Sequence, residues 1–234
     1  APDGEVSMGY REQGYFPQAF INMLALLGWN PGTEKEIFSM DELIASFSLE
    51  KVSKSGARFS HDKAKWFNGQ YMRRADDSQL GAQLAEMLAA KGIVTSVERA
   101  SKAVSLIKER ATFPADLLPL TLYMFEAPES YDEKSVNKSW KKDDVANLLR
   151  LREKLEAMDE IVAETAEPAI HEWIVSEQIS MGRVMNALRI ALLGIAQGPS
   201  IFAIAEFIGK EETLRRIDHA VEKLAVSESD IIYF

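Results

Sequence analysis

The chain of 234 residues contains no cysteine and only three histidines. Without cysteine it can form neither disulfides nor thiolate metal sites, and this composition fits a reducing compartment such as the cytosol. The histidines, His61, His171 and His219, lie far apart in the sequence and form no His-x-x-x-His pair. Imidazole ligands of a zinc site usually come in such pairs, so the sequence predicts no metal site.

Long apolar runs are also missing. No apolar segment approaches the roughly 18 residues that a membrane-spanning helix needs, so we expect no membrane association. The first residues, Ala1 to Glu5, have neither the basic nor the apolar region of a signal peptide. These features together favour the cytoplasm. The chain also starts without methionine, and we therefore expect it to be part of a longer protein.

Positive charge is scarce overall but locally dense. The net charge is -9 and the isoelectric point is about 5.0, which taken alone argues against nucleic-acid binding. Acidic residues, however, concentrate between positions 126 and 172, a stretch that we expect to face away from any nucleic acid. The basic residues gather in two clusters: Lys51, Lys54, Arg58, Lys63, Lys65, Arg73 and Arg74, and then Arg99, Lys102, Lys108 and Arg110.

The pattern of apolar residues predicts an all-α protein. Ser39 with Glu42 and Thr95 with Glu98 read as capping boxes, and Pro114 and Pro168 each suit the start of a helix. The longest alternating pattern, 51–59, is not convincing as a strand. The polar segment 128–141 is the best candidate for a loop or hinge. Helical periodicity is clear in the later part of the chain, in segments 142–158, 182–196, 199–208 and 211–224.

Three stretches resemble a known family. Gly9–Trp29 contains G-Y-F-P-Q-A-F-I-N-M-L-A-L-L-G-W, and Phe59–Arg73 contains K-A-K-W-F-N-G-Q-Y-M-R. Both are similar to segments of glutamyl- and glutaminyl-tRNA synthetases, which are class I aminoacyl-tRNA synthetases. The third stretch, Gly198–Arg216, resembles the carboxy-terminal part of the bacterial glutamyl enzymes. Glutaminyl enzymes end in β-barrels, for which this chain has too few strand signals.

The resemblance implies a fold and a function. It implies a stem-contact region at 1–75 and an all-α helical anticodon-binding domain at 76–234, with subdomains at about 76–127 and 128–234. The chain would recognise tRNA(Glu), while the aminoacylation chemistry, with ATP and magnesium, would belong to a catalytic domain outside it. No cofactor, DNA or membrane partner is expected for this chain, and the family is usually monomeric.

The resemblance also implies site residues. Contacts to the tRNA backbone or stem fall on Lys51, Lys54, Lys63, Trp66 and Arg73, with packing in the core as the alternative for Trp66. Arg110 falls where these enzymes inspect the third anticodon base, and a guanidinium can read base edges through paired donors. The remaining anticodon positions are Arg189, Gly198, Pro199 and Ile201, of which Ile201 would offer an apolar shelf. Unstacked loop bases are what proteins can read in RNA.

Two alternatives remain open. Lys51-Val-Ser-Lys54-Ser55 matches the Lys-Met-Ser-Lys-Ser signature that stabilises ATP phosphates in class I synthetases. That chemistry needs a nucleotide-binding α/β domain and a His-x-Gly-His element, and the chain has no such element, so we interpret the match as coincidental. The other alternative is a helical protein–protein interaction module without tRNA binding, which the acidic surface and the charged segment 142–158 would favour.

Overall fold

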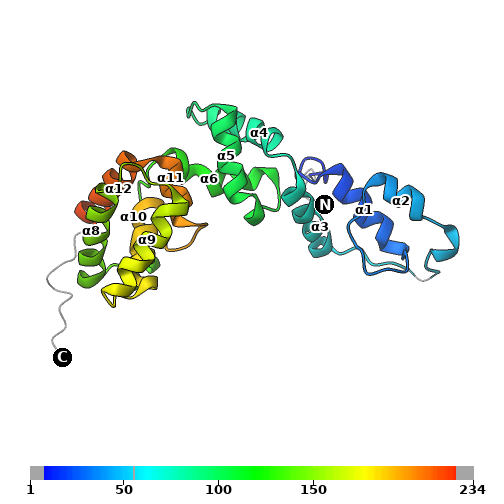
Figure 1. Cartoon of the computed structure of the whole chain (residues 1–234). Helices are drawn as coiled ribbons and strands as arrows, with labels where there is room; N and C mark the ends of the chain where they lie inside the picture. Colours follow the sequence, from blue (N-terminus) through cyan, green and yellow to red (C-terminus); the bar gives the residue numbers. More distant parts are fainter. Residues whose placement is uncertain (1–7, 55, 225–234) are drawn as a thin grey trace. The chain divides into compact units, whose positions relative to one another are not determined.

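The computed structural model describes residues 8–54 and 56–224. Within these ranges all regular structure is helical, apart from one isolated antiparallel bridge between Trp29 and Val52. The all-α prediction is therefore confirmed, and the described residues of 51–59, which are 51–54 and 56–59, form no strand (Figure 1). The chain divides into two compact units, Ala1–Thr121 and Leu122–Phe234, called here the first and second unit.

The first unit is built from helices that begin where the sequence provides a cap. The capping box of Ser39 and Glu42 is confirmed: the amide of Glu42 donates to Ser39 Oγ at 3.2 Å, and the amide of Ser39 donates to Glu42 Oε2 at 2.9 Å. Pro17 occupies the first position of its helix, as proline prefers. The elements are α1 (Pro17–Gly28), α2 (Met40–Ser46), η1 (Leu49–Lys51), α3 (His61–Arg74), α4 (Asp77–Ala89), α5 (Val97–Ile107), η2 (Lys108–Arg110) and η3 (Pro114–Asp116).

Aromatic and aliphatic side chains fill the core of the first unit. Helix α1 packs against α3, where Met23 and Phe67 are buried together with Tyr15. Burial of such side chains is the main favourable contribution to folding, at about 1.5–3 kcal/mol each. Helices α4 and α5 lie side by side as a pair (Figure 1). Their approach is close, because a Cβ atom on Gly81 would lie 2.7 Å from the backbone nitrogen of Ser101.

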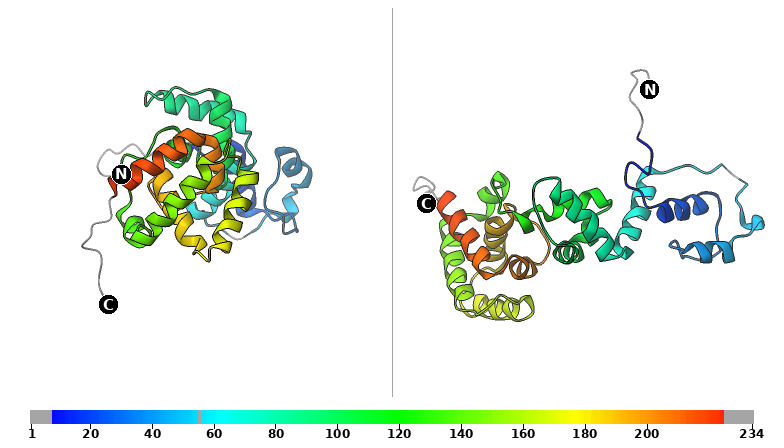
Figure 2. Two further views of the ribbon diagram at one scale, coloured as in Figure 1. Left: turned by 60° about the vertical axis from the view of Figure 1, so that its left-hand side comes forward. Right: turned by 90° about the horizontal axis from the view of Figure 1, so that it is seen from above.

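The second unit is arranged around α10, whose residues are mostly buried. Helices α8 and α12 both pack against α10, and Figure 2 shows the three together. Helix α10 ends at Gly194, which has φ 80° and thus adopts the left-handed conformation that glycine favours. The elements are α7 (Glu133–Ser139), α8 (Lys142–Glu156), α9 (Ala163–Ser176), α10 (Met181–Leu193), α11 (Ile201–Ile208) and α12 (Lys210–Lys223). The division between the units falls within α6 (Leu117–Phe125).

Three local predictions were wrong. Pro168 lies inside α9, which begins five residues earlier, where Glu206 Oε2 accepts a hydrogen bond from the amide of Ala163 at 2.8 Å. The cap of α5 is Ser96 rather than Thr95. The segment 128–141 contains the helix α7 and packs against α10 instead of forming an unstructured hinge.

Candidate nucleic-acid interface

The middle of α3 carries two of the predicted stem-contact residues on its solvent side. Lys63 Nζ lies 3.1 Å from Glu36 Oε1, and both side chains are about half exposed. Trp66 is 42% exposed and meets Phe67 edge-to-face, so it is not core packing alone. The opposite side of the helix, with Ala64 and Phe67, is buried. Helical periodicity therefore presents a lysine and an indole face outward together.

Asn68, in the same motif, is fully buried and has a structural function. Its Oδ1 accepts a hydrogen bond from the amide of Phe16 at 2.8 Å, and its Nδ2 donates to the carbonyl of Thr112 at 2.7 Å. The side chain thereby connects the segment before α1, helix α3 and the turn after η2. Sequence reasoning placed Asn68 within the basic cluster but did not identify this role.

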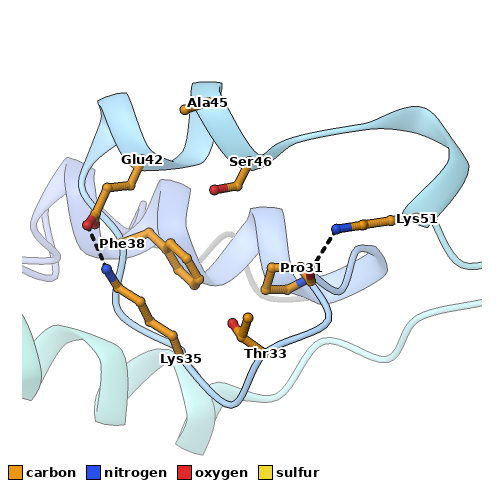
Figure 3. Close-up of a pocket in the computed structure, with 8 residues that line it drawn as sticks. All are labelled: Pro31, Thr33, Lys35, Phe38, Glu42, Ala45, Ser46 and Lys51. Carbon is orange, nitrogen blue, oxygen red and sulfur yellow. Dashed lines mark hydrogen bonds and ion pairs between the residues drawn. The ribbon is translucent and has the colours of Figure 1, made fainter.

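Lys51 and Lys54 lie in a segment that is tied to the end of α1. The amide of Ser53 donates to the carbonyl of Gly28 at 2.7 Å, and Lys51 Nζ donates to the carbonyl of Pro31 at 2.8 Å. Figure 3 shows Lys51 reaching across the mouth of a surface pocket toward Pro31. Lys54 is exposed. Ser55, the last residue of the Lys-Val-Ser-Lys-Ser match, lies outside the described residues.

The same pocket has an acidic side. Lys35 forms an ion pair with Glu42 at 2.6 Å, and Phe38 lies beside them (Figure 3). The hydrogen bond from Lys35 is the largest of the causes that lower the pKa of Glu42. The two lysines at this pocket, Lys35 and Lys51, thus each have a protein partner.

Arg73 contacts the turn η2, which carries Arg110. Arg73 Nε lies 3.3 Å from Glu109 Oε2, the residue before Arg110. Lys108, the first residue of the turn, forms an ion pair with Asp77 at 2.7 Å and donates to the carbonyl of Ala75 at 3.1 Å. Because both residues that precede it are anchored, the exposed Arg110 lies on a braced turn. Lys63 stands about 15 Å from Arg73 along α3, at 1.5 Å per residue.

In the second unit, Arg189 holds the loop between α10 and α11. Its Nη2 donates to the carbonyl of Pro199 at 3.2 Å. Gly198 fits closely beside Leu193, because a Cβ atom at position 198 would lie 2.7 Å from Leu193 Cδ2. The side chain of Leu193 thus fills the space that a side chain at position 198 would need. The structure thus brings Arg189, Gly198 and Pro199 together.

Ile201 does not fit the predicted role of an apolar shelf. Its side chain is only 2% exposed and packs in the interior of the second unit as the first residue of α11. A side chain with so little free surface can give a base almost no contact area. The preceding residue, Ser200, caps α11 by accepting a hydrogen bond from the amide of Ala203.

Arg215 and Arg216 lie on α12, and basic residues late in a helical segment usually face helix carbonyls and solvent, which Arg216 does only in part. Arg216 does contact carbonyls, but it is only 3% exposed. Its Nη1 donates to the carbonyls of Tyr123 and Leu192, at the ends of α6 and α10, and its Nε donates to Glu212 Oε1 at 2.7 Å. Burial lowers its pKa from the ordinary value. Arg215, by contrast, is 59% exposed.

The carboxylate of Glu212 should give the second unit a pH-dependent stability. Hydrogen bonds from Arg215 and Arg216 lower its pKa from 4.5 to about 2. Because the folded-state pKa is the lower one, this contribution is complete above about pH 4.5 and is lost as the pH falls toward about 2. The shift corresponds to at most about 3 kcal/mol, and solvent screening of the partly exposed pair reduces it.

We therefore expect Glu212→Gln to destabilise the chain at pH 7 and to cost clearly less at pH 3. Urea unfolding of both proteins at the two pH values measures this difference. An equal loss at pH 7 and pH 3 would contradict the assigned role of the carboxylate.

Other kinds of site find no support in the part of the chain that the structure describes. Within residues 8–54 and 56–224, histidine and carboxylate side chains form no group of three or more that could hold a metal ion. None of the helices there is long and apolar enough to cross a membrane.

Comparison with known proteins assigns the larger part of the chain. Residues 79–221 match the sequence model of a family described as "Anticodon binding domain". The chain belongs to the anticodon binding domain family. A second match, over residues 4–66, is to the family "tRNA synthetases class I (E and Q), catalytic domain". The segment before the anticodon binding domain, which includes Lys51 and Lys54, is therefore similar to part of the catalytic domain as that family defines it.

Curated relatives extend the likeness beyond the anticodon binding domain. The chain is 45% identical over 221 residues to a glutamate–tRNA ligase of Porphyromonas gingivalis, and 45% identical over 219 residues to one of Flavobacterium johnsoniae. Each match covers 94% of the chain but only 44% of the relative. The resemblance predicted from three short stretches is confirmed, and the chain spans less than half the length of the relatives that it matches.

Solved structures agree with the sequence matches. A crystal structure of a glutamate tRNA ligase from Elizabethkingia meningosepticum in complex with its amino acid is similar with a TM-score of 0.85 and 44% identity, covering 96% of this chain and 44% of that one. A glutamate-tRNA synthetase from Elizabethkingia anophelis is similar with a TM-score of 0.82 and 44% identity, covering 94% of this chain and 43% of that one. The anticodon binding domain here thus has the helical fold of these enzymes.

Proposed function

We propose that this chain is the tRNA-binding part of a glutamate–tRNA ligase and that its partner is tRNA(Glu). The observation that carries the proposal is the match of residues 79–221 to the anticodon binding domain family, in a chain similar to glutamate–tRNA ligases over almost its whole length. The chain would hold the anticodon arm so that the acceptor end reaches a distant active site. Ligation of glutamate, with ATP and magnesium, belongs to the whole protein, which we take to be a cytoplasmic monomer.

Within this proposal the first unit has two tasks. Residues 1–75 form the stem-contact region, in which Lys51, Lys54, Lys63, Trp66 and Arg73 lie against the tRNA backbone. The anticodon-binding domain begins near residue 76, with subdomains at about 76–127 and 128–234. Arg110 reads the third anticodon base from its braced turn, because a guanidinium offers paired donors to a base edge. Helix α3 and the turn η2 supply basic side chains to this surface, among them Lys63, Arg73 and Arg110.

The second unit supplies the rest of the anticodon site. Arg189 is partly buried, and it fixes the loop that carries Gly198 and Pro199. The backbone of this loop, rather than the buried side chain of Ile201, would contact unstacked bases. Most acidic residues of the stretch 126–172 would face away from the RNA, although the segment around Asp132 lies beside this loop, and this arrangement reconciles the net charge of -9 with tRNA binding.

Phosphate binding requires some cations to exchange partners. Lys63 and Arg73 are paired with Glu36 and Glu109 in the free chain, at 3.1 Å and 3.3 Å. Exposed ion pairs of this kind contribute only about 0–1 kcal/mol, so a phosphate can displace the carboxylates at little cost. Each such contact releases counterions, and the affinity should therefore fall with salt.

A salt titration tests the proposed backbone contacts. We expect the logarithm of the affinity for tRNA(Glu) to fall linearly with the logarithm of the salt concentration. Lys54→Glu/Lys63→Glu should weaken binding and reduce the slope by about 0.7–0.9 for each lost contact. The matched control is Lys142→Glu/Lys154→Glu, in which two exposed lysines of α8 are changed by the same charge.

An equal effect of the two double variants on affinity and slope would contradict the stem-contact assignment. A folded chain that binds no tRNA at low salt would contradict the proposed function as a whole. It would favour the helical protein–protein module instead.

A further inference from the structure

The loop that carries Gly198 and Pro199 is fixed at its start as well as at its end. Gly194, with φ 80°, begins it, and its carbonyl accepts a hydrogen bond from the amide of Asp132 at 2.8 Å. A Cβ atom at position 194 would lie 2.8 Å from the carbonyl oxygen of Ser130. The segment before α7 is thus packed directly against the first residue of the loop.

The hydroxyl of Ser135 holds the same loop two residues further along, at Ala196. Ser135 Oγ accepts a hydrogen bond from the amide of Ala196 at 3.2 Å and donates to Asp132 Oδ2 at 2.7 Å. The same carboxylate oxygen accepts a hydrogen bond from the amide of Ser135 at 2.7 Å. These hydrogen bonds lower the pKa of Asp132, which therefore stays ionised and keeps the hydroxyl oriented.

We infer that Ser135 is a positioning residue for the anticodon site: through Ala196 it fixes the start of the loop 194–200 while Arg189 fixes its end. The inference rests on the proposed function. Without the bond to Ala196, the middle of this loop of seven residues could sample more backbone conformations, and groups that recognise a ligand must be held within about 0.5 Å to discriminate well. Nothing in the sequence connects Ser135, in an acidic segment, with the glycine-proline turn some 60 residues later.

The hydroxyl can be removed alone. Ser135→Ala removes the hydroxyl, and Ser135→Thr keeps it. The matched control is Ser176→Ala, because Ser176 is an exposed residue of α9 whose hydroxyl donates only to the nearby carbonyl of Trp173. Two measurements are made on the 234-residue chain. The first is amide hydrogen exchange of residues 194–200 without RNA. The second is the affinity for tRNA(Glu) and for variants with the first, second or third anticodon base changed.

We expect Ser135→Ala to raise exchange at Ala196 about tenfold. It should also reduce discrimination at the first or second anticodon base about five- to tenfold, with little change for the third base, which is assigned to Arg110. Ser135→Thr and Ser176→Ala should behave like the original chain. A general loss of stability would instead weaken binding to all the tRNAs alike. The ratio of the affinities for the original and the changed tRNA would then stay the same, whereas a positioning effect would lower it.

If the original chain discriminates between the tRNAs and Ser135→Ala discriminates equally well, the inference is overturned and the proposed function stays intact. An original chain that binds all the tRNAs equally would overturn both the proposed anticodon readout and this role of Ser135. In that case faster exchange at Ala196 would still identify the contact as purely structural.

Discussion

Replacing Arg216 with methionine is expected to lower the free energy of unfolding of the second unit by about 3–5 kcal/mol. Arg216 is 3% exposed and makes three contacts that no hydrophobic side chain can replace. Its loss would leave Glu212 without its buried partner and the carbonyls of Tyr123 and Leu192 without their donor. Unpaired buried polar groups of this kind each cost about 1–3 kcal/mol.

Arg215 provides the control for this prediction. It donates to the same carboxylate, with its Nε 2.7 Å from Glu212 Oε2, but it is 59% exposed. Arg215→Met should therefore cost no more than about 0.5–1 kcal/mol. Native-state hydrogen exchange of α10 and α12 measures both variants within the second unit. A loss for Arg216→Met that does not exceed the loss for Arg215→Met would contradict the assigned role.

Replacing Asn68 with alanine should destabilise the first unit by about 2–4 kcal/mol. The side chain is fully buried, and its removal leaves the amide of Phe16 and the carbonyl of Thr112 without partners while creating a small cavity. Because these bonds connect segments far apart in the sequence, the loss should appear as faster amide exchange in α1 and α3 together.

The control for Asn68 is Asn30→Ala. Asn30 is exposed, and its Oδ1 accepts a hydrogen bond only within a surface turn, from the amide of Gly32 at 2.7 Å. This variant should stay within about 1 kcal/mol of the original chain. If Asn68→Ala is equally mild, Asn68 is not the connection that we describe.

The helical class was predictable from sequence because each helix buries an apolar stripe, and this periodicity is local. The caps were predictable where both partners lie within one turn, as with Ser39 and Glu42. The start of α9 was not, because its capping carboxylate comes from Glu206, 43 residues later. Pro168 therefore misled the prediction, because it lies in the second turn of α9 and not at the start of the helix.

The candidate site was predictable only in part. The resemblance to the synthetase family pointed to Arg110, Arg189 and Pro199, and the structure places these residues on braced elements within their own units. It could not reveal that Ile201 is buried, because an apolar residue at the start of a helix can face either way. The burial of the charged Arg216 was equally hidden in the sequence. It depends on carbonyls at the ends of α6 and α10, which lie far from Arg216 along the chain.

The proposed reading of the tRNA(Glu) anticodon by this chain can be tested by titration. The chain is titrated at low salt with labelled tRNA(Glu) and with the same tRNA whose third anticodon base is changed from C to G. Arg110→Ala is measured beside it, and Arg99→Ala, an exposed arginine of α5, is the control. A good bidentate contact discriminates bases by about 1–3 kcal/mol, so the original chain should bind the changed tRNA about 5- to 150-fold more weakly. We expect Arg110→Ala to lose this difference and Arg99→Ala to keep it. Equal affinity of the original, folded chain for the two tRNAs would contradict the claim.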